Sequence, residues 1–378
     1  MNDQPSSSAR RSSGGAFSLE RRFVTCRETY DRESERIFSS KWLCVARVEQ
    51  LDPAGKVLPL VYEDHKFFLA SDEDGQVRAF RNFCRHRGSL LVTADNCSSF
   101  GSRIQCPYHA WTYDRQGRLV SAPNMEGVST FCSEDNGLIE IACAVYQGFV
   151  WISFQPETSL EEFLAPVAWQ FEDWGTGDLE IAATLEYDVR ANWKLIFQNY
   201  SECYHCPIVH PALNRLSPYK DSSNDIDSGP ILGGPMQLAE GVETMSSDGA
   251  FVGEPLPGLS EQQLKIVNYF TIFPSMFLST HPDYVMVHLL QRSGVRSTKV
   301  VCHLLFHSAV KESATFDPAS AVEFWDLTNR QDWEVCELAQ AGMEDSAYIP
   351  GPYSNLESVL AEFDRHYKDV MQLSDAVE

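Results

Sequence analysis

The chain has 378 residues, of which 43% are hydrophobic and 22% are charged, a composition typical of soluble globular proteins. Its formal net charge of −23 argues against a nucleic-acid partner, whose phosphates require Lys and Arg. No stretch approaches the roughly 18 to 20 apolar residues of a membrane span, so we also expect no membrane partner.

The cysteine content indicates the redox state of the cellular compartment in which the protein works. Eleven cysteines are an odd number, and no secretory signal is recognisable. Both observations argue against a disulfide framework and favour a reducing compartment in which some cysteines bind metal. We therefore expect a cytoplasmic protein.

The chain order indicates four segments. Residues 1–18 are rich in Ser and Arg and are expected to form a disordered tail. Residues 19–40 have the apolar spacing of an amphipathic helix, which is expected to pack on the C-terminal domain. Short apolar runs bounded by Asp, Gly and Pro indicate an all-β domain over 41–156, with a hairpin turn at Asp74-Gly75. A second domain is expected over 157–378.

Two short motifs lie in the β domain. Cys84 and His86 form the first, and Cys106 and His109 form the second. Two thiolates and two imidazoles suit a [2Fe–2S] cluster with two Cys on one iron and two His on the other. A zinc site of the same composition is the alternative, but finger-type zinc sites keep their cysteines together and their histidines together. The alternating order favours the iron–sulfur cluster.

The second domain is expected to combine a sheet with helices. A helix is predicted over 192–200, because apolar residues there share one face and Pro207 prevents the helix from continuing. Residues 214–265 are rich in Ser, Asp, Gly and Pro and are expected to be loops. Four strands of one antiparallel sheet are then predicted over 267–273, 275–278, 284–290 and 298–306. Two closing helices are predicted over 319–342 and 354–371.

A dense run of ligand-type residues lies just beyond the predicted helix at 192–200. Glu202, His205 and His210 lie within nine positions. Two imidazoles near a carboxylate are the donor set of a non-haem iron site with open coordination positions. Cys203 and Cys206 interleave with the histidines, so a four-ligand zinc site is the alternative at this point.

Taken together, the motifs resemble a known family. CRHRG at 84–88 and CPYHAWTYDRQGRL at 106–119 resemble the Rieske [2Fe–2S] motif, and the 202–210 run resembles the mononuclear iron motif of Rieske oxygenase α subunits. The resemblance implies an α+β fold. It combines an all-β Rieske domain with a helix-grip (START-like) catalytic domain that contains a large antiparallel sheet.

The resemblance also implies roles for individual residues. In this family an Asp on the penultimate helix completes the iron site, and NRQDWEVCELAQ at 329–340 matches best at Asp332, with Asp326 and Glu334 as alternatives. The acid at the position of Glu202 is a bridge in the family. It joins an iron ligand to a Rieske histidine of the next chain, which implies a head-to-tail homotrimer.

Electrons must reach the two metal groups from outside the chain. No Gly-x-Gly-x-x-Gly fingerprint for a nicotinamide cofactor is present. The resemblance therefore implies O2 as co-substrate, and a separate flavin/[2Fe–2S] reductase that delivers electrons from NAD(P)H.

The predicted substrate is a small molecule. Glu at the bridge, ECYHC at 202–206 and GPYSNLE at 351–357 resemble the subgroup that oxidises quaternary ammonium compounds. A trimethylammonium group favours an aromatic cage, for which the candidates are Tyr200, Tyr204, Tyr269 and Phe273. Aromatic-ring hydroxylation is the alternative on the same scaffold. A Rieske electron-transfer protein and a zinc-stabilised binding module are the alternatives from other classes.

Overall fold

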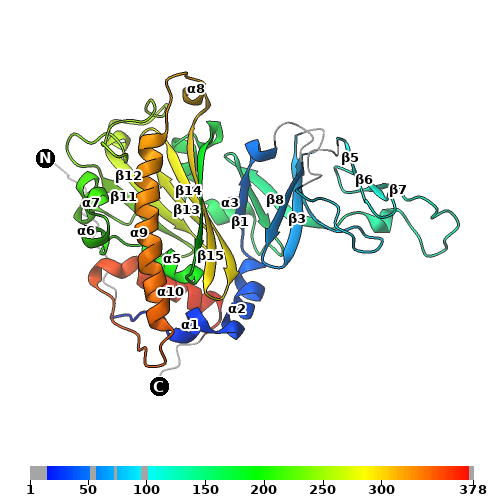
Figure 1. The fold of residues 1–378 in the computed structure, drawn as a ribbon, viewed down its shortest axis with the longest axis horizontal. Coiled ribbons are helices and arrows are strands. Elements are labelled where there is room, and N and C mark those ends of the chain that lie inside the picture. The colour runs from blue at the N-terminus through cyan, green and yellow to red at the C-terminus, as the bar shows by residue number, and fades with distance from the viewer. Residues whose placement is uncertain (1–14, 52–56, 72–74, 95–100, 374–378) are drawn as a thin grey trace. The chain divides into compact units, whose positions relative to one another are not determined.

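The computed structural model describes residues 15–51, 57–71, 75–94 and 101–373 (Figure 1). The chain forms two compact units, one running from Ser39 to Phe163 and the other combining the chain up to Phe38 with the chain from Leu164 onward. Among the described residues, no helix is both long and apolar enough to cross a membrane.

The unit from Ser39 to Phe163 is built on antiparallel sheets. Its main sheet has six strands in the order β1-β9-β8-β4-β3-β2, and a second sheet has the order β5-β6-β7. The bounds are β1 Leu43–Arg47, β2 Val57–Tyr62, β3 His65–Ser71, β4 Val77–Arg81, β5 Arg103–Gln105, β6 Thr112–Asp114, β7 Leu119–Ser121, β8 Glu140–Tyr146 and β9 Phe149–Ser153. Asp74 of the predicted hairpin turn lies outside the described residues.

The second unit contains the large sheet. Six antiparallel strands follow the order β10-β15-β14-β13-β12-β11. Their bounds are β10 Leu179–Val189, β11 Ile231–Gln237, β12 Ile266–Ile272, β13 Met276–Thr280, β14 Val285–Gly294 and β15 Ser297–His307. The four strands predicted between 267 and 306 are confirmed as β12 to β15. Strand β11, in contrast, was expected to be loop.

The described residues of the two units contain ten α-helices. The bounds are α1 Arg21–Thr25, α2 Arg27–Glu33, α3 Leu160–Leu164, α4 Ala168–Asp173, α5 Trp193–Tyr200, α6 Cys206–Val209, α7 Pro211–Leu216, α8 Ser308–Lys311, α9 Ala319–Met343 and α10 Ser358–Val370. The predicted helix at 192–200 is α5, and the Asn192 side chain caps it by accepting from Lys194 N.

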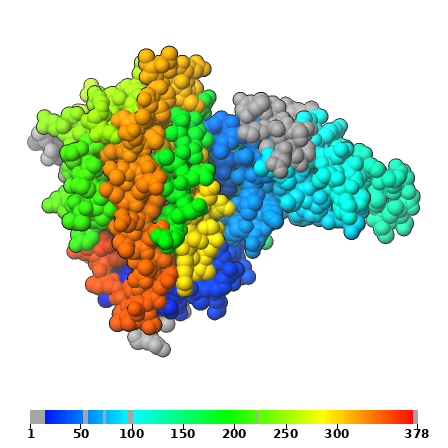
Figure 2. Space-filling model, in the orientation of Figure 1, coloured from blue at the N-terminus to red at the C-terminus, as the bar shows by residue number. Residues whose placement is uncertain are grey.

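Helix α9 is the longest helix described. Its buried residues recur every three or four positions, from Ala321 through Trp325 and Cys336 to Met343, so one stripe faces the protein interior. The opposite face is seen at the molecular surface in orange (Figure 2), and it includes Leu338, which is 65% exposed.

The expectation of a disordered tail over residues 1–18 is wrong for Phe17 and Ser18. Residues 1–14 lie outside the described residues. Phe17, however, forms an antiparallel bridge with Pro352, and Ser18 N donates to Gly351 O at 2.9 Å. Backbone pairing with a distant loop therefore fixes residues that a polar composition alone assigns to a tail.

Candidate metal centres and substrate pocket

The local fold after α5 brings two imidazoles close together. His205 immediately precedes the one-turn helix α6, and His210 separates α6 from α7, which begins with Pro211. Proline suits the first position of a helix because its missing N–H would have no partner there. Two short helices in place of one continuous helix let His205 and His210 approach with ring centroids 5.1 Å apart.

Asp332 of α9 completes this group. One ligand atom from each of His205, His210 and Asp332 lies within 4.8 Å of the other two. Asp332 Oδ1 is 2.7 Å from His210 Nε2 and 3.3 Å from His205 Nε2. A long helix and an irregular loop, distant in sequence, thus present two nitrogens and one carboxylate around a common point.

The outer nitrogen of each imidazole is held by another residue. The Glu202 carboxylate accepts from His205 Nδ1 at 2.6 Å, and Gln331 Oε1 accepts from His210 Nδ1 at 2.8 Å. A proton on each Nδ1 leaves both Nε2 lone pairs directed at the centre of the group. Two neutral imidazoles and one carboxylate fit a divalent iron with open positions.

The electrostatics of the group agree with a site for a cation. Burial alone would raise the pKa of Asp332, but hydrogen bonds to His205 and His210 lower it below its usual range. Burial opposes charging of His205, but its hydrogen bonds to Asp332 and Glu202 outweigh that effect and raise the pKa of His205 to about 10. The carboxylates thus favour positive charge at this point, which a metal ion would supply in place of a proton.

The other acids considered for the third position lie elsewhere. Asp326 accepts from Tyr187 Oη at 2.8 Å and pairs with Arg330 at 2.8 Å, and Glu334 is exposed. Neither Asp326 nor Glu334 is three or four positions from Asp332, so neither shares the face of α9 that Asp332 presents to the histidines.

The two cysteines of the run are joined to each other. A disulfide links Cys203 to Cys206, whose Cα atoms are 5.0 Å apart, and the remaining eight cysteines of the described residues are free. A turn of three residues places the two sulfurs within bonding reach. The expectation that the cysteines are reduced is thus wrong for this pair. The zinc alternative also loses two of its four ligands, because disulfide sulfurs carry no thiolate charge.

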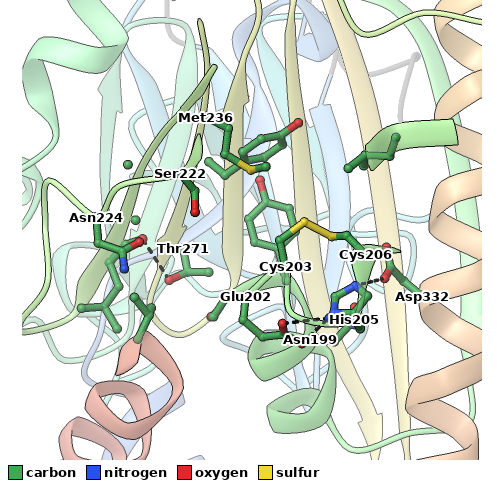
Figure 3. Close-up of a pocket in the computed structure, with 18 of the residues that line it drawn as sticks. Asn199, Glu202, Cys203, His205, Cys206, Ser222, Asn224, Met236, Thr271 and Asp332 are labelled. Atoms are coloured by element: carbon green, nitrogen blue, oxygen red, sulfur yellow. Dashed lines mark hydrogen bonds and ion pairs between the residues drawn. A yellow bond between two sulfur atoms is a disulfide. The ribbon is translucent and has the colours of Figure 1, made fainter. Parts of the chain in front are cut away.

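A cavity of about 120 Å³ opens next to the triad, between α5, α9 and the sheet (Figure 3). Of the predicted cage residues, Tyr200 and Tyr269 line this cavity and Tyr204 and Phe273 do not. Tyr204 is 54% exposed, since its backbone N–H is drawn to the Glu202 carboxylate and its ring turns outward. Phe273 lies beyond the end of β12 and packs on Trp193 and Phe363 in the core.

In the β unit, two loops bring the predicted cluster ligands together in pairs. Each loop closes on itself: Gly88 N donates to Cys84 O at 2.9 Å, and Ala110 N donates to Cys106 O at 3.1 Å. Cys84 and Cys106 are buried, whereas His86 and His109 are exposed and their ring centroids are 4.8 Å apart. Two buried thiols and two exposed imidazoles fit a two-iron cluster that would be held by two Cys on one iron and two His on the other.

A tyrosine supports the sulfur side. Tyr113 Oη lies 3.3 Å from Cys84 Sγ and accepts from Arg85 N at 3.1 Å, so its own proton is available to a Cys84 thiolate. Burial raises the pKa of the Cys84 thiol, the hydrogen bond from Tyr113 opposes this, and the neighbouring Cys106 thiol adds to it. A cationic cluster would supply the charge that stabilises both thiolates at this buried position.

Comparison with known families agrees with both centres. Residues 176–373 match the ring hydroxylating alpha subunit (catalytic domain) family, and residues 41–132 match the Rieske [2Fe–2S] domain. The chain belongs to the ring-hydroxylating α-subunit family of Rieske oxygenases. It is therefore an oxidoreductase, whose cofactors are a Rieske cluster and a mononuclear iron and whose co-substrate is O2.

Individual relatives of this Rieske oxygenase cover most of its length. The carnitine monooxygenase oxygenase subunit of Escherichia coli is 34% identical over 345 residues, covering 88% of this chain and 86% of the relative. The glycine betaine monooxygenase oxygenase subunit of Pseudomonas aeruginosa is 28% identical over 374 residues, covering 91% and 86%.

The fold is shared with a solved protein. A quaternary ammonium Rieske monooxygenase, studied for carnitine oxidation by gut microbiota and inter-subunit electron transfer, superposes with a TM-score of 0.80 at 23% identity. The superposition covers 95% of this chain and 97% of the solved one.

Several pocket and support residues of the oxygenase escape sequence reasoning. Gln331 holds His210, and Trp325, His288 and Asn329 line the cavity. His288 Nε2 lies 3.1 Å from Asn329 Oδ1, and burial lowers the pKa of His288 to about 4. Trp325 and Asn329 precede Asp332 on α9 by seven and three positions, which is the helical repeat. That spacing from Asp332 was the one available signal.

Proposed function

We propose that this chain is the oxygenase component of a Rieske monooxygenase system that hydroxylates an N-methyl group of a small quaternary ammonium compound. Cys84, His86, Cys106 and His109 would hold the [2Fe–2S] cluster, and His205, His210 and Asp332 would hold the mononuclear iron. When bound, these groups would supply one-electron transfer and the activation of O2.

The pocket beside the triad carries this proposal. Its volume of about 120 Å³ is close to the roughly 150 Å³ of a cavity that accepts benzene, so it has room for a small substrate. Rings of Tyr200, Tyr269 and Trp325 line it together with the carboxylates of Glu202 and Asp332. Aromatic faces and carboxylates both attract a cation.

The chain's own side chains would position the substrate and handle protons. Overall, an N-methyl group, O2, two electrons and two protons give an N-hydroxymethyl group and water, and the N-hydroxymethyl group then releases formaldehyde. The aromatic walls would orient the methyl group toward the triad and exclude water. Glu202, bonded to His205 Nδ1, would keep the proton on that nitrogen and so preserve the ligating tautomer.

The proposal includes partners. A separate flavin/[2Fe–2S] reductase would supply electrons from NAD(P)H in the cytoplasm. A head-to-tail homotrimer would place the cluster of one chain beside the iron of its neighbour, with Glu202 as the bridge. The inter-subunit electron transfer described for the solved relative supports this arrangement.

Metal analysis of matched variants tests the assignment. Chain purified without oxygen should contain about three irons and two sulfides, since a Rieske cluster accounts for two of each. Asp332→Ala should fall to about two irons and keep the cluster spectrum. Asp326→Ala, on the same helix, should retain all of its iron. Full iron content in Asp332→Ala would contradict the assignment of the mononuclear site. Release of formaldehyde from a trimethylammonium substrate, in the presence of a reductase, tests the proposed reaction.

A further inference from the structure

The β unit contains a series of aromatic contacts that starts at a proposed cluster ligand. The rings of His86 and Trp111 stack, with their centroids 4.8 Å apart and their planes inclined by 9°. Trp111 is only 3% exposed, and its other neighbour is Phe131, whose ring centroid lies 5.6 Å away at an inclination of 66°. Phe131 is partly exposed. Two ring contacts therefore connect His86 through a buried indole to a side chain at the surface.

Phe131 belongs to a compact loop, residues 122–138, that follows β7 (Figure 1). Two successive turns shape it, since Val128 N donates to Met125 O at 3.3 Å and Phe131 N donates to Val128 O at 3.0 Å. Met125 and Phe131 pack against the hydrophobic core that contains Trp111. The loop is thus held on this core by apolar side chains, and its polar side chains remain at the surface.

The charged residues of the 122–138 loop are all acidic. Glu126, Glu134 and Asp135 are exposed, and the loop has no Lys, Arg or His. Among the described residues, no ion pair neutralises these three acids. Val128, between them in sequence, is 41% exposed. The loop therefore presents negative charge together with an apolar side chain, a combination that suits a protein partner with a basic face.

The imidazole side of the cluster site differs in charge from this loop. His86 and His109 are exposed there, and the Tyr108 ring lies 3.8 Å from the His109 ring. The guanidinium of Arg87 lies 5.1 Å from the centre of the Tyr108 ring. In the proposed trimer this side would face the bridging acid Glu202 of the next chain. A donor that arrives from solution would then need another approach to the cluster.

We propose, resting on the proposed function, that the electron-donating partner docks on the 122–138 loop and that its electron reaches the cluster through Phe131 and Trp111. The partner is a protein whose redox group lies at a basic surface, because the three acids of the loop attract Lys and Arg. Each encounter would transfer one electron, with no bond formed or broken. Complexes of this kind bury less than about 1,200 Å², which allows the donor to leave after each transfer.

Electron exchange with a basic redox protein tests the proposal. Cytochrome c has lysines around an exposed haem edge and accepts one electron. The holoenzyme is reduced with dithionite, freed of excess reductant and mixed with ferricytochrome c in a stopped-flow spectrometer. The rate of cluster oxidation then reports transfer through the same surface in the opposite direction. In the wild type this rate should fall as the ionic strength is raised, because salt screens the attraction.

Charge reversal locates the docking surface. Glu126→Lys/Glu134→Lys/Asp135→Lys should slow the reaction about tenfold or more at low ionic strength, and the difference should vanish at high ionic strength. The net charge of −23 attracts cytochrome c to other surfaces as well, so a matched pair is needed. Asp64→Lys makes the same charge change as Asp135→Lys at an exposed position between β2 and β3. Asp135→Lys should slow the reaction more than Asp64→Lys.

A second variant separates the electron route from docking. Phe131→Leu keeps an apolar side chain on Trp111 but removes the ring. The rate should fall at every ionic strength, whereas the salt dependence, the reduction potential and the electron paramagnetic resonance spectrum of the cluster should stay unchanged. Phe163→Leu is the matched control, because Phe163 makes a similar edge contact with Trp151 in the same unit, with centroids 6.2 Å apart. Its rate should equal that of the wild type.

The outcomes separate this inference from the proposed function. Equal rates for Asp135→Lys and Asp64→Lys overturn the docking surface, and a wild-type rate in Phe131→Leu overturns the aromatic route. Either result leaves the oxygenase assignment in place, because iron content and formaldehyde release test that assignment separately. Holoenzyme without a reducible [2Fe–2S] spectrum would overturn the proposed function and this inference with it.

Discussion

Gln331 and His210 form a hydrogen bond of 2.8 Å that fixes the imidazole from behind. The next residue along α9, Asp332, contacts the other nitrogen of the same ring at 2.7 Å. Adjacent residues of one helix thus hold both sides of one ligand, so the position of α9 determines the orientation of His210.

Removing this support should loosen the metal. In Gln331→Ala the His210 ring loses the acceptor that keeps its Nδ1 protonated, and we expect iron affinity to fall about 10- to 100-fold. Competition with a chelator, followed by iron analysis, measures the change. Arg330→Ala is the control, because Arg330 pairs with Asp326 on the exposed side of the helix. Unchanged iron affinity in Gln331→Ala would show that the hydrogen bond has no role in ligation.

The disulfide of Cys203 and Cys206 should be dispensable for metal binding. In the double variant Cys203→Ser/Cys206→Ser we expect iron per chain to stay within about 10% of the wild type, because the donors are two imidazoles and a carboxylate. Metal analysis of the double variant, with His205→Ala as the positive control for loss, measures this. Loss of metal, or zinc in place of iron, would revive the four-ligand zinc site.

Glu33 is the centre of a buried ionic network. Its carboxylate lies 2.5 Å from Lys194 Nζ and 2.8 Å from Arg292 Nη1, with all three side chains at most 1% exposed. Glu33→Gln leaves two buried cations without their counter-charge and should cost about 3–5 kcal/mol of unfolding free energy. Chemical denaturation measures it. Glu186→Gln, which breaks the exposed pair with Lys299, should cost less than about 1 kcal/mol, and a similar cost for both would refute the argument from burial.

Asp364 should make stability depend on pH. Burial raises the pKa of this carboxyl to about 7, against hydrogen bonds from Tyr353 and Gln198 that lower it. The folded state then holds the proton more tightly than the unfolded chain. The stabilisation is complete below about pH 4 and is lost as pH rises through about 7, at about 1.4 kcal/mol per pKa unit.

Comparison of two Asp→Asn variants measures the contribution of Asp364. Unfolding free energies of Asp364→Asn at pH 5 and pH 8 should differ less than those of the wild type. The exposed Asp369 provides the control, since Asp369→Asn should keep the wild-type difference. An unchanged pH dependence in Asp364→Asn would assign the titration to another group.

Tyr113 should tune the Rieske cluster. Its hydroxyl lies 3.3 Å from Cys84 Sγ, and a hydrogen bond donated to a thiolate ligand stabilises the more negative, reduced state. Tyr113→Phe should lower the reduction potential by about 60 mV, the equivalent of one net hydrogen bond of about 1.4 kcal/mol in a one-electron step. Redox titration followed by electron paramagnetic resonance measures this shift. Tyr62→Phe in the same unit is the control, and equal potentials for Tyr113→Phe and the wild type would exclude the role.

Local sequence patterns were sufficient to predict the elements whose position depends mainly on burying apolar residues. Apolar runs predicted β12 to β15, and a one-sided apolar stripe with Pro207 beyond it predicted α5. Strand β11 was missed because Gly233, Gly234 and Pro235 are poor strand formers, and their place in the sheet comes from pairing with β12 and the 222–226 segment.

Contacts between distant residues were harder to foresee. The bond between Gln331 and His210 depends on how α9 docks, and no local signal in a polar helix face distinguishes Gln331 from its neighbours. Phe273 was a candidate for the aromatic cage, but the strand ends at Ile272 and the ring enters the core. Tyr204 turned outward for a similarly local reason, the bond of its amide to Glu202.

The two metal centres differ in when their donors become available during synthesis. Cys84, His86, Cys106 and His109 are translated together and lie in one compact unit. The site of His205 and His210 is complete only after Asp332 has been synthesised, and Asp332 follows His109 by more than half of the chain length. We expect the Rieske unit to be able to acquire its cluster while the rest of the chain is still being synthesised. Mononuclear iron can bind only after α9 has docked. Premature termination before α9 should therefore yield a coloured protein without oxygenase activity.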